Sequence, residues 1–152
     1  MKVGILYSGG KDSTYAAYIA EQQGNEITCL ITMVPESSES YLFHYPNIAW
    51  TDLQSQALGV PIVKTKLKSV GESEVQELAN AIKKAKEKHF FEAVVTGGLA
   101  SKYQKDRIEA VCNDAGLKTL SPSWMMDPEE YMLNIIKSGF KVMIVGVAAE
   151  GL

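Results

Sequence analysis

The sequence predicts an α/β protein, doubly wound, with a mainly parallel sheet of five to six strands and helices on both faces. Short apolar runs rich in β-branched residues alternate with longer segments in which apolar residues recur every three or four positions. The apolar runs are continuous, as in strands buried on both faces. A helix between successive strands provides the crossover that parallel strands require.

The first half of the chain predicts three strands and two helices. In order, these are a strand at 2–7, a helix at 12–24, a strand at 26–34, a helix at 51–59 and a strand at 61–66. In the first helix Tyr15, Ala16, Ile19 and Ala20 lie at helical spacing, and a glycine ends each helix, Gly24 and Gly59.

The second half continues the alternation. It predicts a helix at 72–88, a strand at 92–98, a helix at 101–115, a short strand at 118–120, a helix at 128–138 and a last strand at 140–147. The helix at 72–88 is the clearest, because its apolar residues repeat at steps of three and four with lysines between them.

Composition limits the function classes. We expect one domain over residues 1–152, since the chain has 152 residues with 46% hydrophobic and 22% charged. A net charge of −3 argues against a broad nucleic-acid surface, and no apolar run is long enough for a membrane span. The two cysteines, Cys29 and Cys112, form no metal or disulfide motif, so a reduced cytoplasmic location is expected. The oligomeric state is left open, a homo-oligomer included.

Ligands of open α/β sheets bind at the carboxyl ends of the strands. The loop after the first strand, Tyr7-SGGKDS, is the strongest candidate there. Its glycines Gly9 and Gly10 let backbone N–H groups approach an oxyanion, while hydroxyls and a cation add donors at a helix N-terminus. The expected nucleotide-binding residues of this loop are Tyr7, Ser8, Gly9, Gly10, Lys11, Asp12 and Ser13.

The loop matches neither the Walker A nor the GxGxxG pattern. A tight turn with Asp12 as helix N-cap is the simpler alternative. It does not explain Lys11, because a cation at a helix N-terminus is unfavourable unless an anion compensates it. We therefore favour phosphate binding.

SGGKDS looks like the PP-loop of the ATP pyrophosphatases, which adenylate an oxygen of their substrate. Together with TMVPESSESYLFHYPN, TDLQSQALGVP, TGGLASKYQKDRIEAVC and SPSW, it resembles the diphthine–ammonia ligase family over nearly the whole chain. Members of that family continue into a second region with a glycine- and glutamate-rich motif, which is absent from this sequence. The resemblance implies an adenine nucleotide alpha hydrolase-like, Rossmann-like fold.

The same resemblance implies ATP and Mg²⁺ as cofactors, ammonium as a substrate and translation elongation factor 2 as the protein substrate. The carboxylate of diphthine would be adenylated with loss of pyrophosphate, and ammonia would then displace AMP to give the amide. Lys11 and Asp12 would act on the phosphates, Asp12 also toward Mg²⁺, and no dedicated metal site is expected. The alternatives are a PP-loop enzyme for tRNA sulfur transfer and a non-catalytic nucleotide-binding module.

Two further pairs of residues are expected to contact the nucleotide. Thr32 and Met33 end the second strand, where a hydroxyl and a soft apolar side chain suit ribose and adenine, although plain packing explains Met33 equally well. Gly97 and Gly98 permit close backbone approach after the fourth strand, with a simple turn as the alternative.

The helix that follows supplies three catalytic candidates, Tyr103, Gln104 and Arg107. Tyr103 and Arg107 share a helix face, and a guanidinium suits a phosphate or a substrate carboxylate. The alternative is an ordinary ion pair with Glu109 or Asp106, or a solvated arginine. The resemblance, which has YQ followed by basic residues, favours the catalytic interpretation.

Two other positions remain open. Glu74 matches an acidic position of the family, but an acid in a first helical turn is common for electrostatic reasons alone. His44 is a lone loop histidine, which more often has a structural role, and with His89 as the only other histidine no histidine cluster can form.

Overall fold

The computed structural model describes residues 1–35, 48–68 and 71–145. Within them, five parallel strands form one sheet in the order β3-β2-β1-β4-β5. The strands are β1 (Lys2–Leu6), β2 (Glu26–Pro35), β3 (Ile62–Leu67), β4 (Ala93–Val95) and β5 (Lys118–Leu120). The order reverses direction between β1 and β4, so the carboxyl ends of these two neighbouring strands form the switch point of the sheet.

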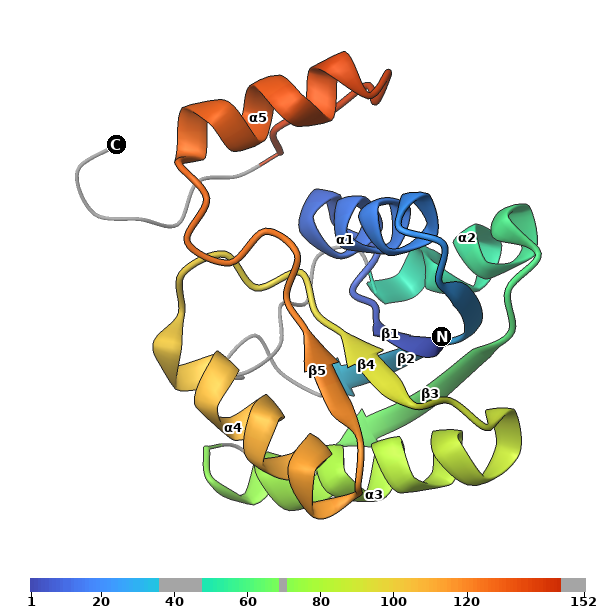
Figure 1. Cartoon of the computed structure of the whole chain (residues 1–152). Coiled ribbons are helices and arrows are strands. Elements are labelled where there is room, and N and C mark those ends of the chain that lie inside the picture. The colour runs from blue at the N-terminus through green and yellow to red at the C-terminus, as the bar shows by residue number, and fades with distance from the viewer. Residues whose placement is uncertain (36–47, 69–70, 146–152) are drawn as a thin grey trace.

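The helices cover both faces of the sheet, as Figure 1 shows. They are α1 (Lys11–Gln22), α2 (Thr51–Leu58), α3 (Ser73–His89), α4 (Lys102–Asp114) and α5 (Pro128–Lys137), with a 3-10 turn η1 at Ile48–Trp50. Helices α1 and α2 lie on one face, α3 and α4 on the other. The fold prediction of a doubly wound parallel sheet is confirmed, with five strands in the described residues.

Alternating strand residues separate two apolar layers. Ile5 and Val95 pack with the alanines of α1 on one face, whereas Leu6 and Val94 pack with α3 and α4 on the other. The continuous apolar runs of β1 and β4 follow from this, because a strand covered on both faces has no solvent side.

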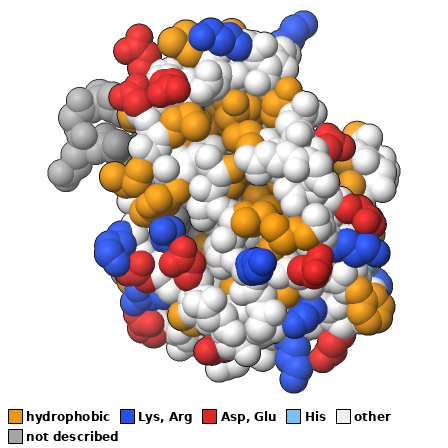
Figure 2. Space-filling model, in the orientation of Figure 1, with side chains coloured by type: hydrophobic (Ala, Val, Ile, Leu, Met, Phe, Trp, Pro, Cys, Tyr) orange, Lys and Arg blue, Asp and Glu red, His pale blue; other side chains and the backbone are white. Residues whose placement is uncertain are grey.

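Helix α5 packs on α1 rather than on the sheet. Tyr15 of α1 and Tyr131 and Ile135 of α5 form a separate apolar cluster with part-buried neighbours. In the orientation of Figure 1, Figure 2 shows hydrophobic side chains gathered in the upper half of this face, below α5, while charges of both signs intermix lower down. This face therefore carries no stripe of a single charge.

The prediction of a strand at 140–147 is wrong for the part that the structure describes, because residues 140–145 belong to no strand. A strand needs a neighbour to hydrogen-bond, and α5 leads the chain away from the sheet edge. Met143 and Val145 are accordingly 84% and 75% exposed. The strand predicted at 92–98 is also shorter, since regular pairing covers only Ala93–Val95. The other elements lie within two residues of their predicted bounds.

None of the helices in the described ranges is long and apolar enough to cross a membrane.

Candidate functional site

A cleft of about 290 Å³ opens where β1, β2 and β4 end. Its described lining combines apolar side chains from the strand ends with polar groups from two glycine-containing loops. The lining residues are Leu6, Tyr7, Ser8, Asp12, Ser13, Ile31, Met33, Ile48, Thr96, Gly97, Gly98, Leu99, Ala100, Ser101, Gln104 and Ile108. The cleft therefore lies where the sheet topology predicts a ligand site.

The loop after β1 is fixed by its own hydroxyls. The backbone N–H of Ser8 donates to Oγ of Ser13 at 3.2 Å, and the two serine hydroxyls share a second hydrogen bond. Gly9 has φ +78°, a conformation that favours glycine. Gly10 is the N-cap of α1 and provides no side-chain cap. The N-terminus of α1 therefore has no side-chain cap at Gly10, and Asp12 is not the N-cap that the simpler alternative assumed.

Gln54 of α2 supports the same loop from behind. Its Nε2 donates to the carbonyl oxygen of Gly9 at 3.0 Å, across 45 positions of sequence. Its Oε1 is buried and has no partner among the described residues. The role of Gln54 was not predictable, because a glutamine in a short amphipathic helix carries no sequence signal of a tertiary contact.

Lys11 and Asp12 form a charged pair at the start of α1. Nζ of Lys11 donates to Oδ1 of Asp12 at 2.7 Å, and both side chains are partly exposed, at 31% and 39%. The hydroxyl of Tyr131, from α5, donates to the same Oδ1 at 2.7 Å. Asp12 lines the cleft, whereas Lys11 stands beside it with its ammonium 5.9 Å from the centre of the Tyr131 ring.

Gly97 interlocks the loop after β4 with the first turn of α1. A Cβ at Gly97 would lie 2.6 Å from the carbonyl carbon of Asp12 and 2.7 Å from the backbone nitrogen of Ser13. At Gly98 the nearest atom would be Oγ1 of Thr96 at 3.7 Å, an ordinary contact. Gly97 therefore permits a close backbone approach, and its partner is the backbone of Asp12 and Ser13 in the first turn of α1.

Of the candidate residues at the ends of β1 and β2, some line the cleft and one is buried in the core. Met33 lines the cleft, as does Tyr7, whose hydroxyl shares a hydrogen bond of 3.2 Å with Thr14. Thr32 is fully buried and donates to the carbonyl oxygen of Tyr7 at 2.7 Å, so it braces β1 from β2 instead of lining the cleft. Burial raises the pKa of the Tyr7 phenol above its ordinary value, which keeps that hydroxyl neutral.

The three candidates of α4 point in different directions. Gln104 lines the cleft. Arg107 forms an ion pair with Glu72 and stacks on the ring of Tyr103, with 3.4 Å between its guanidinium carbon and the ring centre. The hydroxyl of Tyr103 also donates to Glu72, at 3.5 Å. The partner in this ion pair thus lies just before the neighbouring helix α3, and not on α4 itself.

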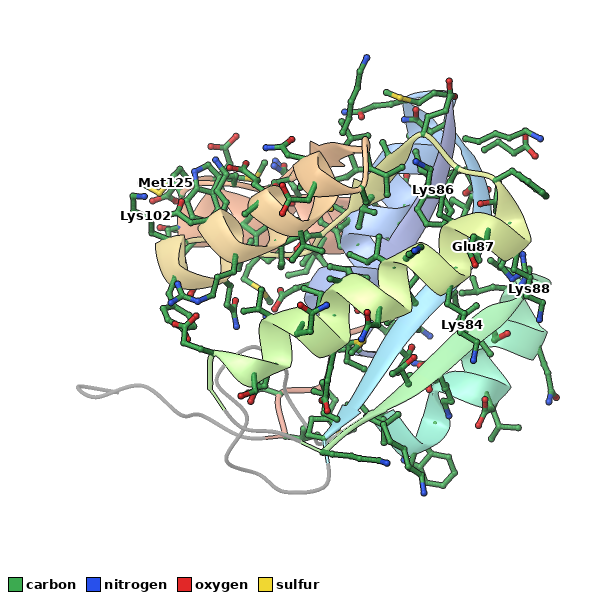
Figure 3. The ribbon with its side chains drawn as sticks, turned by 90° about the horizontal axis from the view of Figure 1, so that it is seen from below. Lys84, Lys86, Glu87, Lys88, Lys102 and Met125 are labelled. Carbon is green, nitrogen blue, oxygen red and sulfur yellow. The ribbon has the colours of Figure 1, made fainter. Side chains whose placement is uncertain are left out.

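This second charged cluster lies outside the described lining of the cleft. The pKa of Glu72 is lowered, mainly by its hydrogen bond from Arg107, and the pKa of Arg107 is raised by the same bond. In Figure 3, Lys102 and Met125 lie at the end where α4 begins, while Lys84, Lys86 and Lys88 lie toward the C-terminal end of α3.

Glu74 is fully buried, and its Oε1 accepts from the backbone N–H of Gly71 at 3.2 Å. It is not among the described residues of the cleft lining, and its hydrogen bond with Gly71 closes the turn that starts α3. His44 lies outside the described residues. In the part of the chain that the structure describes, no three His, Cys, Asp or Glu side chains gather as a metal cluster.

Two kinds of site residue escaped the sequence analysis. Tyr131 reaches Asp12 from a helix that begins more than a hundred positions away, and only the packing of α5 on α1 brings them together. Thr96 and Ser101 line the cleft on either side of Gly97 and Gly98. Their place in the loop after β4 was a usable signal, because the glycines beside them were already candidates.

A parallel doubly wound sheet, with a glycine-containing loop opening a helix beside a cleft at its switch point, defines an α/β protein of the nucleotide-binding type. The chain belongs to the family described as "Diphthamide synthase N-terminal domain", whose sequence profile matches residues 1–119. The profile includes the loop after β1, the loop after β4 and α4, and it ends before α5.

Named relatives agree with the family. The chain is 30% identical to the "Diphthine--ammonia ligase" of Mus musculus and to that of Homo sapiens, each match covering 100% of this chain and 64% of the relative. It is 32% identical to the protein of that name from Schizosaccharomyces pombe, over 100% of this chain and 28% of the relative. The chain thus spans less than two thirds of the length of these relatives.

Two solved structures share the fold. A predicted subunit of tRNA methyltransferase from Methanocaldococcus jannaschii aligns with a TM-score of 0.56 at 18% identity, covering 99% of this chain and 82% of that one. The U34-tRNA thiolase NcsA from Methanococcus maripaludis aligns with a TM-score of 0.58 at 14% identity, covering 100% and 61%. At these identities the likeness concerns the fold.

Proposed function

We propose that the chain is the ATP-binding domain, over residues 1–152, of an ATP-dependent ligase that forms a C–N bond, with diphthine on translation elongation factor 2 as acceptor and ammonium as nitrogen donor. The observation that carries the proposal is the uncapped N-terminus of α1, which opens beside the cleft behind Ser8, Gly9 and Gly10. The family and the names of the relatives support the reaction class.

The loop and the start of α1 would bind the phosphates of ATP. Backbone N–H groups at a helix N-terminus carry partial positive charge and suit an oxyanion. Lys11 is close enough to add its ammonium, because it stands beside the cleft on the first turn of the same helix. The hydroxyls of Ser8 and Ser13 would add donors by exchanging their mutual hydrogen bond for one to a phosphate oxygen.

The apolar part of the cleft would hold the base. Leu6, Ile31 and Met33 line it from the strand ends, and Ile48 and Ile108 from the flanking segments. A volume of about 290 Å³ is near the lower end of the range for small-molecule sites, which suits a nucleoside with its phosphates directed along the loop. Gln104 and Ser101 supply polar groups at the edge.

The described lining of the cleft offers Mg²⁺ one carboxylate ligand. Asp12 is the one acidic side chain in the described lining, and Mg²⁺ beside ATP is usually held by one or two carboxylates together with phosphates and water. Asp12 would hold the ion, which when bound offsets the charge of the leaving pyrophosphate. Among described residues, no second acidic side chain lines the cleft, so the phosphates would supply further ligands.

The reaction needs positioning more than a protein nucleophile. A carboxylate oxygen of the acceptor attacks the α-phosphorus and pyrophosphate leaves. The nitrogen of ammonia then attacks the acyl carbon, AMP leaves and a proton goes to solvent, which completes the amide. Lys11 and the α1 terminus would stabilise charge that develops on the phosphates, and the cleft would orient the reactants. Tyr103, Arg107 and Glu74 would act from outside the described lining, Arg107 toward the acceptor carboxylate.

The two cysteines favour this reaction over sulfur transfer. Both are free and fully buried. Burial raises the pKa of Cys29 to about 11, and it also raises the pKa of Cys112. A thiol held neutral and away from the cleft is a poor nucleophile. Free thiols also fit the reducing, cytoplasmic setting that we propose for the reaction.

The test incubates the protein with Mg-ATP, ammonium and elongation factor 2 that carries diphthine. AMP and pyrophosphate should appear, and the mass of the factor should change by replacement of one OH with NH₂. AMP without a change in the factor would sink the acceptor assignment. ATP that binds but stays intact, with and without the factor, would instead identify a nucleotide-binding module.

A further inference from the structure

Helix α5 reaches back to the first turn of α1 through one side chain. Tyr131 is 2% exposed, and its ring packs edge-on against Tyr15 of α1 with 5.6 Å between ring centres. Its hydroxyl emerges from this apolar cluster at the carboxylate of Asp12, 2.7 Å from Oδ1. The family profile ends at residue 119, so this contact comes from a part of the chain that the profile does not include.

Asp12 receives both of its side-chain hydrogen bonds on one oxygen. Lys11 and Tyr131 each donate to Oδ1 at 2.7 Å. Among the described residues, no hydrogen bond or ion pair to Oδ2 is found. Because Asp12 lines the cleft, Oδ2 is the oxygen left for a ligand there.

The two donors differ in what they do when an anion arrives. Lys11 is flexible and partly exposed, so a phosphate beside the loop competes with Asp12 for its ammonium. Tyr131 cannot turn away, since its ring is buried against α1 and α5. Burial, followed by the hydrogen bond to Asp12, raises the pKa of the Tyr131 phenol, so the hydroxyl keeps its proton and remains a donor.

We propose that Tyr131 is a positioning residue for the ATP site: its hydroxyl holds Oδ1 of Asp12, so that Oδ2 stays directed to the cation that accompanies ATP after Lys11 has turned to the phosphates. The proposal rests on the ATP binding put forward above. It does not depend on the identity of the acceptor.

The decisive variant is Tyr131→Phe, which removes the hydroxyl and keeps the ring. Calorimetric titration measures ATP affinity at several Mg²⁺ concentrations and in EDTA. We expect the dissociation constant of Mg-ATP to rise about tenfold, as for the loss of one hydrogen bond to a charged group. The affinity for ATP in EDTA should change by less than about twofold. The Mg²⁺ concentration for half-maximal binding should rise as well.

Tyr18→Phe is the matched control. Tyr18 belongs to the same aromatic cluster, stacked on Tyr15, but no hydrogen bond from its hydroxyl is found within the described residues. Its removal should leave Mg-ATP affinity unchanged. An equal loss in both variants, or a loss in Tyr131→Phe that is the same with Mg²⁺ and in EDTA, would mean a purely structural role and would overturn the proposal.

A double-mutant cycle keeps the test valid if Tyr131→Phe lowers the unfolding midpoint. In an Asp12→Asn background the hydroxyl has no carboxylate to hold, so Tyr131→Phe should cause no further loss of Mg-ATP affinity. The same tenfold loss in that background would contradict the proposal.

The outcome separates this proposal from the proposed function. Binding of Mg-ATP with the expected loss in Tyr131→Phe, but no amide formed by the wild type, would sink the ligase assignment and support the role of Tyr131. Amide formation by the wild type, with unchanged Mg-ATP affinity in Tyr131→Phe, would support the ligase assignment and overturn the role of Tyr131. A wild-type protein that does not bind Mg-ATP would overturn both.

Discussion

Two cation–carboxylate pairs lie near the same edge of the sheet, and they differ in what surrounds them. Lys11 and Asp12 stand at the uncapped start of α1, where Asp12 lines the cleft and one of its oxygens has no described partner. Arg107 is paired with Glu72 and covered by the ring of Tyr103. Neither Arg107 nor Glu72 lines the cleft in the described residues.

The difference shows that a charged side chain at the carboxyl edge of the sheet is not by that fact alone able to bind a ligand. A side chain is available to a ligand when its own neighbours leave a donor or acceptor open. The first pair meets that condition because Oδ2 of Asp12 has no hydrogen bond or ion pair among the described residues, while Oδ1 accepts from Lys11 and Tyr131. In the second pair a substrate carboxylate must displace Glu72, so any role of Arg107 in catalysis begins with opening that pair.

The largest effect should come from Gly97→Ala, which disturbs the backbone around Lys11 and Asp12. The added Cβ would lie 2.6 Å from the carbonyl carbon of Asp12, so the loop and α1 must separate. We expect a loss of stability of about 3 kcal/mol and no measurable ATP binding. Denaturant unfolding and calorimetry check this. Gly98→Ala, with its nearest contact at 3.7 Å, should be nearly neutral in stability.

Lys11→Ala should come next, with the loss confined to binding. The ammonium is partly exposed and contributes little to packing, so the unfolding midpoint should hold. The dissociation constant of ATP should rise about tenfold or more, because a charge-assisted contact to phosphate is lost. Lys102→Ala is the control, since Lys102 is 80% exposed at the start of α4. Unchanged ATP affinity in Lys11→Ala would mean that the loop after β1 is only a structural turn.

Arg107→Ala tests the second region and should have a smaller effect than Lys11→Ala. ATP affinity should stay near the wild-type value, and amide formation should fall because the acceptor carboxylate loses its partner. Stability should hardly change, whereas Val111→Ala, on the buried face of the same helix, should lower it by about 1 to 2 kcal/mol. An equal fall in unfolding midpoint for both variants, with normal turnover, would make Arg107 a structural residue.

The smallest effect concerns pH and Glu72. Its pKa is lowered by Arg107, so the ion pair stabilises the folded protein above the ordinary glutamate value of 4.5. This contribution is lost as the pH falls through the lowered pKa. The stability difference between wild type and Glu72→Gln should therefore shrink toward acid pH, as followed by urea unfolding. A difference that grows toward acid would contradict the pairing.

Much of the fold follows from local pattern. Strands such as β1 and β4 are covered on both faces, and this leaves continuous apolar runs that are readable without a structure. The segment 140–145 has the same kind of pattern but lacks a neighbouring strand. Apolarity and β-branching predict that a segment can pair; they carry no information about whether a partner edge is within reach.

That the loop after β1 lines the cleft was predictable, because its chemistry and its position at the end of a strand coincide. The role of a residue was not predictable where a long-range contact decides it. The hydroxyl of Thr32 donates to the carbonyl oxygen of Tyr7, and Oε1 of Glu74 accepts from the backbone N–H of Gly71. The contact of Tyr131 with Asp12 depends on the way α5 docks, which a pattern of apolar residues on α5 alone does not specify.

The contact of Gly97 with Asp12 also joins two segments that the ribosome makes at different times. The loop after β1 is synthesised early, whereas β4, which leads to Gly97, is synthesised more than eighty residues later. At the usual rates of translation this interval lasts about 4 to 17 seconds. During it, β1 has an open edge on the side that β4 later fills. A nascent chain stalled before β4 would therefore expose the edge of a strand, which is a binding target for chaperones.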